Sequence, residues 1–147
     1  MMKKYIIFDI KSKELNRKVR VSIYLPHTYQ KNDKKYPVLY MHDGQNLFDD
    51  RLASYGKSWG IINAFENDQT LPELIVVGID STDTRSDELV PFKFYSEHDK
   101  RYSGGKSDSY YNFIIKTLKP IIDEKYRTIT SALQTGIMGS SYGGLSS

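Results

Sequence analysis

The chain has 147 residues, of which 39% are hydrophobic and 27% charged, a balance typical of a globular protein with one ordinary core. The formal net charge of +3 is mild and the two signs are interspersed, which excludes the basic stripe of a nucleic-acid binder. The lack of cysteine excludes disulfides and thiolate metal sites. No window has the pattern of a signal peptide or a membrane span, so we expect a cytoplasmic protein without a membrane partner.

The N-terminal third of the chain predicts three strands. Residues 5–10 are mostly apolar, and residues 19–25 alternate between apolar and polar side chains, as half-buried antiparallel strands do. Residues 37–41 are continuously apolar, which is typical of a parallel strand buried on both faces. This third strand leads directly into the polar segment 42–46.

The middle of the chain predicts a helix, a strand and a long loop. Ser58 is a suitable N-cap for a helix over residues 59–67, and residues 74–79 form a second buried apolar strand. Residues 80–106 have no clear periodicity. Loops of this length in compact domains are usually functional or disordered.

The C-terminal part predicts one long helix, one strand and a sharp turn. Apolar side chains recur at spacings of three and four from Ser107 or Asp108 to about residue 125, and Pro120 is expected to kink or split that helix. A last strand over residues 134–138 follows. Two antiparallel strands followed by strands joined through helices predict a mixed, mainly parallel α/β sheet, which makes residues 1–147 part of a single domain.

Ser141 is the first candidate for chemistry. It lies in Gly139-Ser140-Ser141-Tyr142-Gly143, a Gly-x-Ser-x-Gly sequence that directly follows a predicted strand. This pattern is typical of a nucleophilic serine on a tight turn from a strand into a helix, where the next N–H can bind an oxyanion. The alternative is that Ser141 only forms a glycine-rich turn.

The segment His42-Asp43-Gly44-Gln45 is the second candidate, because it follows the first parallel strand. In an α/β-hydrolase this position supplies the other half of the oxyanion hole, and the N–H of Gln45 or its neighbour is the expected donor. A rival role for His42 is general base for the serine. The nearby carboxylates of Asp43, Asp49 and Asp50 lack the alternation of a calcium loop, so we expect helix caps and solvated groups rather than a metal site.

The long loop supplies a third set of candidates. Arg85, Glu88, Tyr95 and Tyr102 lie in a segment that leaves a strand next to the serine turn, so these groups should overhang the same crevice. They could hold a substrate. Equally, Arg85 and Glu88 could pair with each other and fix the loop.

Four stretches along the chain also resemble one known family. They are 40–49 (YMHDGQNLFD), 85–91 (RSDELVP), the segment from 104–106 (GGK) into 113–122 (FIIKTLKPII), and 138–144 (MGSSYGG). Together they resemble the Putative esterase family of α/β-hydrolases, which includes esterase D, enterochelin and related siderophore esterases, and feruloyl or acetyl-xylan esterases.

The resemblance implies a serine hydrolase that acts on small-molecule carboxylic esters through an acyl-enzyme, without a cofactor or metal. Ser141 would be the nucleophile, and the N–H groups of Tyr142 and of the residue near Gln45 would bind the oxyanion. The substrate would be contacted by residues of the second and third candidate sets: His42, Asp43, Arg85 and Glu88.

The chain departs from the family pattern after the serine turn. The acid and the histidine of the triad should follow Ser141 in the chain order Ser, Asp or Glu, His, and neither is found among the six residues that follow it. We therefore expect an α/β-hydrolase fold truncated after this turn, with its serine strand at an open sheet edge, low stability and little turnover alone. A second polypeptide could supply the missing half. The alternative function is a non-catalytic module that binds a sugar or aryl ligand in the crevice.

Overall fold

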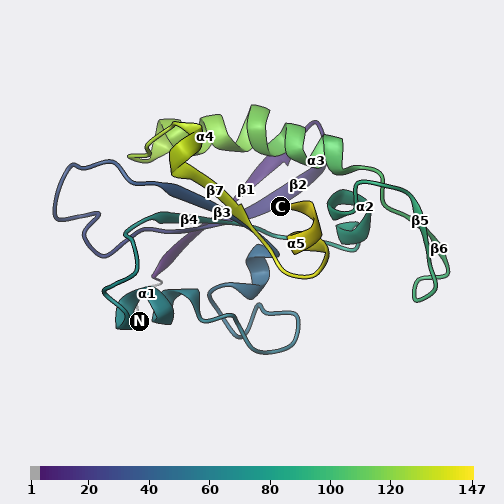
Figure 1. Ribbon diagram of the computed structural model, residues 1–147, viewed down its shortest axis with the longest axis horizontal. Coiled ribbons are helices and arrows are strands. Elements are labelled where there is room, and N and C mark those ends of the chain that lie inside the picture. The colour runs from purple at the N-terminus through teal and green to yellow at the C-terminus, as the bar shows by residue number, and fades with distance from the viewer. Residues whose placement is uncertain (1–3) are drawn as a thin grey trace.

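The computed structural model describes residues 4–147, and residues 1–3 lie outside it. Five strands form one mixed sheet in the order β1-β2-β4-β3-β7, and β5 and β6 form a separate hairpin (Figure 1). The elements are β1 (Tyr5–Ser12), β2 (Arg17–Tyr24), β3 (Val38–His42), η1 (Gly44–Asn46), α1 (Ile61–Asn67), β4 (Ile75–Ile79), α2 (Arg85–Leu89), β5 (Phe94–Ser96), β6 (Arg101–Ser103), α3 (Ser107–Phe113), η2 (Ile114–Leu118), α4 (Lys119–Lys125), η3 (Ala132–Gln134), β7 (Thr135–Met138) and α5 (Tyr142–Ser146).

The predicted mixed sheet is present, with its antiparallel and parallel parts where the sequence patterns indicated them. Strand β2 pairs antiparallel with both β1 and β4, whereas β3 pairs parallel with β4 and β7. In the parallel register His42 lies opposite Ile79, and Met41 lies opposite Met138. The carboxyl ends of β3, β4 and β7 therefore meet at one edge of the sheet, where ligands bind in open α/β sheets.

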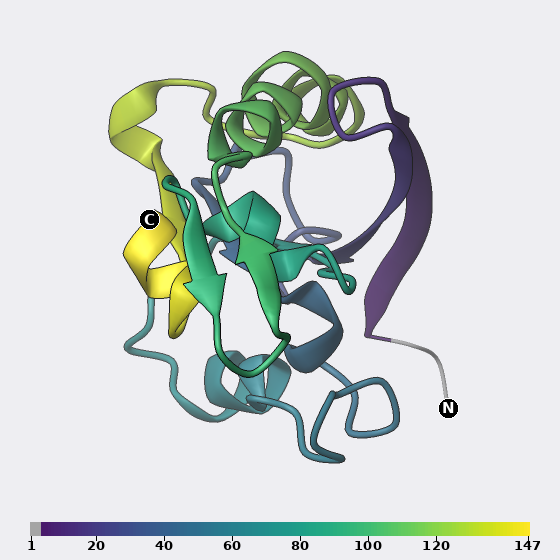
Figure 2. The same cartoon turned by 90° about the vertical axis from the view of Figure 1, so that its right-hand side faces the viewer.

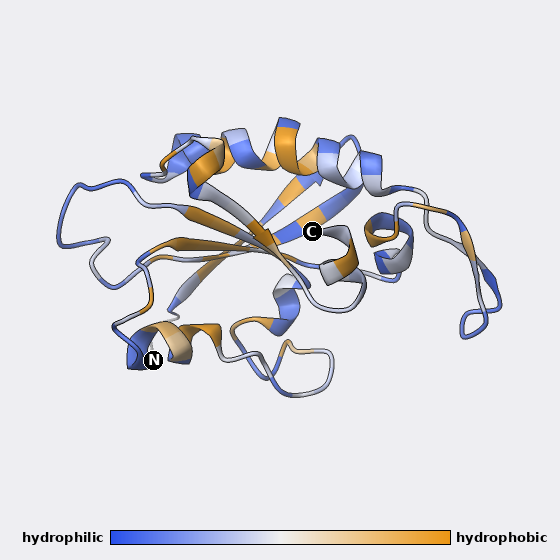
Figure 3. Cartoon of the chain, in the orientation of Figure 1, coloured by the Kyte–Doolittle hydropathy of each residue, from blue (hydrophilic) through white to orange (hydrophobic). Residues whose placement is uncertain are grey.

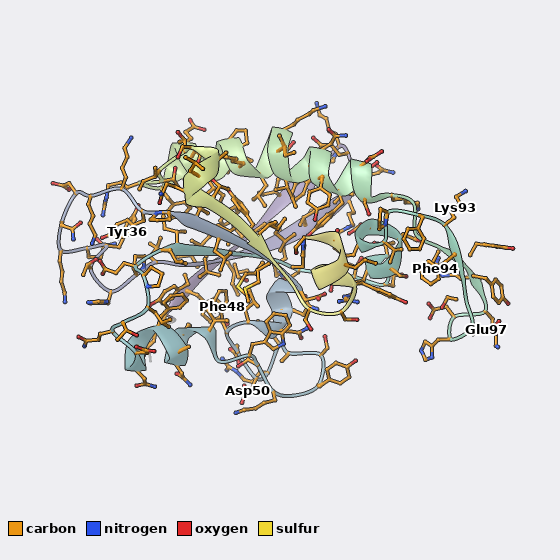
Figure 4. The ribbon with its side chains drawn as sticks, in the orientation of Figure 1. Tyr36, Phe48, Asp50, Lys93, Phe94 and Glu97 are labelled. Atoms are coloured by element: carbon orange, nitrogen blue, oxygen red, sulfur yellow. The ribbon has the colours of Figure 1, made fainter. Side chains whose placement is uncertain are left out.

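Each face of the sheet is covered by a separate apolar layer. The continuous rod α3–η2–α4 packs Phe113, Leu118 and Ile122 on one face. On the other face Leu47 and Ile62 belong to a second cluster of buried apolar side chains, and Phe48 points into this layer between the sheet and α1 (Figures 3 and 4). Strand β4 is the middle strand of the sheet, and it is buried at every position because both layers close over it.

Two local predictions were wrong, each for an identifiable reason, and a third was confirmed. Helix α1 begins at Ile61, and Gly60, with a left-handed φ of 67°, takes the N-cap position without a side-chain cap. Ser58 instead donates its N–H and hydroxyl to Asp50. The segment predicted as a structureless loop contains α2, β5 and β6, which are too short to show a period. The regular α-helix is interrupted next to Pro120, as predicted. The irregularity is a π-helical turn, η2, just before it, and Pro120 lies in the first turn of α4, where its missing N–H costs little.

Strand β7 lies at the edge of the sheet, as predicted for the strand that carries the serine turn. Alternate residues of β7 are exposed, and Met138 keeps 50% of its surface accessible. The hairpin β5–β6 projects beside α5 on the same side of the molecule (Figure 2), where Phe94 contacts the ring of Tyr142. Within residues 4–147 no helix is long and apolar enough to cross a membrane.

Candidate active site

Ser141 occupies a strained turn between β7 and α5. Its φ and ψ of 57° and −122° lie in a region that side-chain-bearing residues rarely adopt. Such a conformation costs on the order of 1–3 kcal/mol and persists only where the surroundings hold it. The side chain is exposed, so the turn presents its hydroxyl at the surface.

Two glycines allow this turn to close. A Cβ on Gly139 would lie 2.6 Å from the carbonyl carbon of Gly143 and 2.7 Å from Cδ2 of His42. A Cβ on Gly143 would lie 3.3 Å from Cβ of His42. The first and last glycines of Gly-x-Ser-x-Gly are therefore required because α5 folds back against β7 directly above the His42 ring.

His42 is a fully buried support for the turn. None of its surface is exposed, and its Nδ1 lies 2.8 Å from the hydroxyl of Tyr110 on α3. Its Nε2 has no hydrogen-bond partner within residues 4–147, so it makes no hydrogen bond to Ser141. Burial lowers the pKa of His42 to about 4, against a smaller opposing effect of Asp43, so the ring is neutral at pH 7.

Asp43 begins the loop that faces the turn. Its φ and ψ of 57° and 47° are left-handed, and its carboxylate accepts hydrogen bonds from Arg85 and from the hydroxyl of Ser81. Burial alone would raise the pKa of Asp43, but these hydrogen bonds outweigh it and hold the pKa below its ordinary value. The carboxylate is thus charged and fully engaged at neutral pH.

Gln45 is fixed in the same loop by its side chain. Its Oε1 accepts the N–H of Ser81 at 3.0 Å, and its Nε2 donates to the Ser81 hydroxyl at 2.9 Å. Gln45 and Tyr142 both lie in the first turn of a helix, η1 and α5 respectively. The N–H groups of a first turn have no partner within their own helix.

A cavity of about 500 Å³ joins the two loops. Its wall is mostly polar, with two aromatic side chains, and includes predicted site residues from both loops. The lining residues are Asp43, Gln45, Asn46, Ser54, Tyr55, Trp59, Ser81, Thr82, Arg85, Ser140 and Ser141.

Two predicted substrate-binding residues lie away from this cavity. His42 is buried beneath the turn, and the buried carboxylate of Glu88 binds Arg17 through two hydrogen bonds of 2.8 and 2.7 Å. Arg85 does not pair with Glu88 but with Asp43. Glu88 is therefore engaged in anchoring α2 to β2, and neither residue is available to a ligand in the cavity.

The predicted aromatic and acidic groups of the loops also have local partners. Tyr95 and Tyr102 contact each other across the hairpin, with ring centroids 5.4 Å apart, and neither lines the cavity. Asp49 binds Arg51 and Tyr5, and Asp50 binds Ser58 and Lys57.

Among the residues of the cavity and its support, the sequence reasoning missed Ser81, Trp59 and Tyr110. Ser81 joins Asp43 to Gln45, Trp59 lines the cavity, and Tyr110 bonds His42. Ser81 could have been found, because it follows a predicted parallel strand and so had to lie at the same sheet edge as His42 and Ser141. No signal marked Tyr110, which reads as a core residue of its helix.

A serine on a strained strand-to-helix turn, beside a loop from the adjacent parallel strand, defines this chain as an α/β-hydrolase fold. The family described as Putative esterase matches residues 12–147, and the chain belongs to this family. Uncharacterized protein YbbA of Bacillus subtilis (strain 168) is 31% identical over 127 residues, which are 86% of this chain and 48% of YbbA.

Solved structures agree on the fold. An IroE-like serine hydrolase from Shewanella oneidensis superposes with a TM-score of 0.76 at 26% identity, over 96% of this chain and 44% of the other. The BES protein of Bacillus cereus superposes with a TM-score of 0.71 at 20% identity, over 99% of this chain and 54% of the other. The chain thus spans about half the length of the proteins it matches.

Proposed function

We propose that Ser141 is the nucleophile of a carboxylic-ester hydrolase that acts through an acyl-enzyme. The observation that carries the proposal is the backbone of Ser141, held at a φ of 57° at the wall of a 500 Å³ cavity with its side chain exposed. Strain of this kind concentrates at functional sites. Membership of an esterase family supports the same reaction class.

In this reaction the Oγ of Ser141 attacks the ester carbonyl carbon and loses its proton to a base. The N–H groups of Tyr142 and Gln45 receive the negative charge that develops on the carbonyl oxygen, the largest single contribution in acyl transfer. The tetrahedral intermediate then expels the alcohol, which takes up a proton. Water hydrolyses the acyl-serine in a second, equivalent cycle.

We infer that the histidines of this chain do not supply the base. His42 is buried and neutral, His27 lies near Glu73 in a separate cavity, and His98 is exposed in the hairpin turn. None of them hydrogen-bonds Ser141 within residues 4–147. We propose that the histidine and its acid come from residues beyond these 147, on the same polypeptide or on a second one that completes the sheet beside β7.

Hydrolysis of p-nitrophenyl acetate tests the proposal. We expect the 147 residues alone to turn over slowly, because a serine without its base keeps only the contribution of the oxyanion hole and binding. The residual rate should be lost in Ser141→Ala and kept in Ser140→Ala, a matched control one residue away. A rate that is equal in Ser141→Ala and the parent chain would overturn the role of Ser141. Rapid turnover that depends on Ser141 would overturn the requirement for an external base.

A further inference from the structure

We propose that Arg85 is a positioning residue that holds the two halves of the oxyanion hole at a fixed spacing. One half is the loop 43–46, and the other is the serine turn with the start of α5. The catalytic meaning of this clamp rests on the proposed function, but the clamp itself is a statement about structure and can be tested without turnover.

The guanidinium of Arg85 contacts both halves at once. Its Nε and Nη2 donate to the two carboxylate oxygens of Asp43 at 2.6 and 2.8 Å. The same Nη2 donates to the carbonyl oxygen of Ser140 at 3.3 Å, and the guanidinium carbon lies 5.6 Å from the centre of the Tyr142 ring. Asp43 precedes Gln45 by two residues, while Ser140 and Tyr142 flank Ser141. One planar side chain therefore links the segments that carry both expected oxyanion donors.

Both ends of this link have backbones that need external support. Asp43 and Ser141 each have a φ of 57°, which is unfavourable for a residue with a side chain. A bidentate pair with a carboxylate fixes direction as well as distance, which a single point charge cannot do. The fork of Arg85 thus suits the holding of a strained loop.

The helix that carries Arg85 is itself anchored. Glu88 on α2 binds Arg17 of β2 through two hydrogen bonds and accepts a third from the hydroxyl of Thr84 at 2.9 Å. Tyr142 is flanked on another side by Phe94, with ring centroids 6.0 Å apart. Arg85 therefore extends from a helix that is anchored to the sheet to the serine turn after the edge strand β7. This arrangement also explains why Glu88 is buried although it does not reach the cavity.

Two simpler roles compete with the clamp. Arg85 could only neutralise the buried carboxylate of Asp43, or it could bind an anionic group of the substrate, since it lines the cavity. Neutralisation needs one positive charge and would be satisfied by lysine. Substrate binding would affect anionic esters and leave neutral ones unchanged.

Hydrogen exchange of the purified protein, read by mass spectrometry on peptides that cover 43–47 and 139–146, separates these roles. In Arg85→Met we expect exchange about tenfold faster in both segments, as for the loss of charged hydrogen bonds. In Arg85→Lys we expect the first segment to stay close to the parent protein and the second to exchange faster. Lys4→Met is the control, because the Lys4 side chain makes an exposed pair with Glu66 on α1 and should leave both segments unchanged.

The clamp would be overturned if Arg85→Met left segment 139–146 unchanged, or if Arg85→Lys restored both segments. Steady-state kinetics provide a second test of the clamp wherever turnover is measurable. A clamp lowers kcat for neutral and anionic esters by the same factor, whereas a rise in KM confined to anionic esters would overturn it in favour of substrate binding. Absence of Ser141-dependent turnover would reject the proposed function and leave the exchange result valid.

Discussion

The two loops that border the cavity are held in very different ways. The loop 43–46 leaves β3, which is paired on both sides, and Gly44 packs so closely on β4 that a Cβ there would lie 2.6 Å from the carbonyl carbon of Gly78. The serine turn leaves β7 at the edge of the sheet, where alternate residues are exposed. One half of the site is built into the sheet, while the other rests on a few contacts with α2, α3 and β3.

This difference shows where the site is vulnerable. The sheet fixes the first half, so substitutions there should be felt as loss of stability of the whole domain. The second half depends on contacts with His42, Arg85 and Tyr111. The Tyr111 hydroxyl donates to the carbonyl and hydroxyl oxygens of Ser146 at the end of α5. The predictions below separate these contributions, from the largest effect to the smallest.

The buried ring of His42 should make stability depend on pH. Its pKa is about 4 in the folded protein and near 6.5 when unfolded, so the unfolded chain binds more protons between these values. This contribution is present above pH 6.5 and is lost as the pH falls towards 4, by about 3 kcal/mol in total. Measured by urea unfolding, the free energy of unfolding of the parent should rise between pH 4 and 7 by about 3 kcal/mol more than that of His42→Gln. Parallel curves for the two proteins would contradict the assignment.

Gly139 should tolerate no side chain. Its Cβ would meet the Gly143 backbone and the His42 ring below 3 Å, so Gly139→Ala is expected to cost about 2 kcal/mol of stability through overpacking. Gly136→Ala, in the strand that leads into this turn, is the control, since a Cβ there meets only the Leu39 side chain at 3.1 Å. Chemical denaturation of both variants measures the difference. An equal effect at the two positions would mean that the turn is looser than described.

The buried carboxyl group of Asp80, under the loop 43–46, should give the stability a pH dependence opposite to that of His42. Burial raises its pKa to about 6, and its Oδ1 is buried without a hydrogen-bond partner within residues 4–147. Because the folded pKa is raised, the protonated form favours folding, and this contribution is lost as the pH rises from about 4 through 6. Asp80→Asn should therefore be more stable than the parent at pH 7, by about 1–2 kcal/mol. Asp83→Asn, an exposed neighbour, should show no such gain; a gain of equal size there would rule out burial as the cause.

The smallest expected effect is at Tyr111. Removing its hydroxyl in Tyr111→Phe deletes the hydrogen bonds to Ser146 and should cost about 1 kcal/mol. The loss should appear as faster hydrogen exchange in 142–147 with little change in 43–47. Equal changes in both segments would show that Tyr111 does not act on the serine turn alone.

The sequence predicted the parts of this molecule that depend on pattern. Apolar runs at 37–41 and 74–79 and the Gly-x-Ser-x-Gly turn predicted the parallel strands and the order of elements, because burial on both faces and tight turns leave clear residue signatures. The ion-pair partners of charged side chains left no such signature in the sequence. Arg85 could pair with Glu88 or Asp43 from sequence alone, and only the spatial course of α2 decides for Asp43. Burial of His42 was likewise invisible, because it follows from α5 folding back over β3.

The central claim, that Ser141 is the nucleophile between two oxyanion donors, is tested most directly by mapping acylation. After long incubation with an aryl acetate, the peptide 128–147 is isolated and fragmented to locate the acetyl group. We expect one acetyl group on Ser141, formed ahead of any on Ser140, Ser146 or Ser147 and absent in Ser141→Ala. Acetylation spread evenly over these four serines, or unchanged in Ser141→Ala, would contradict the account.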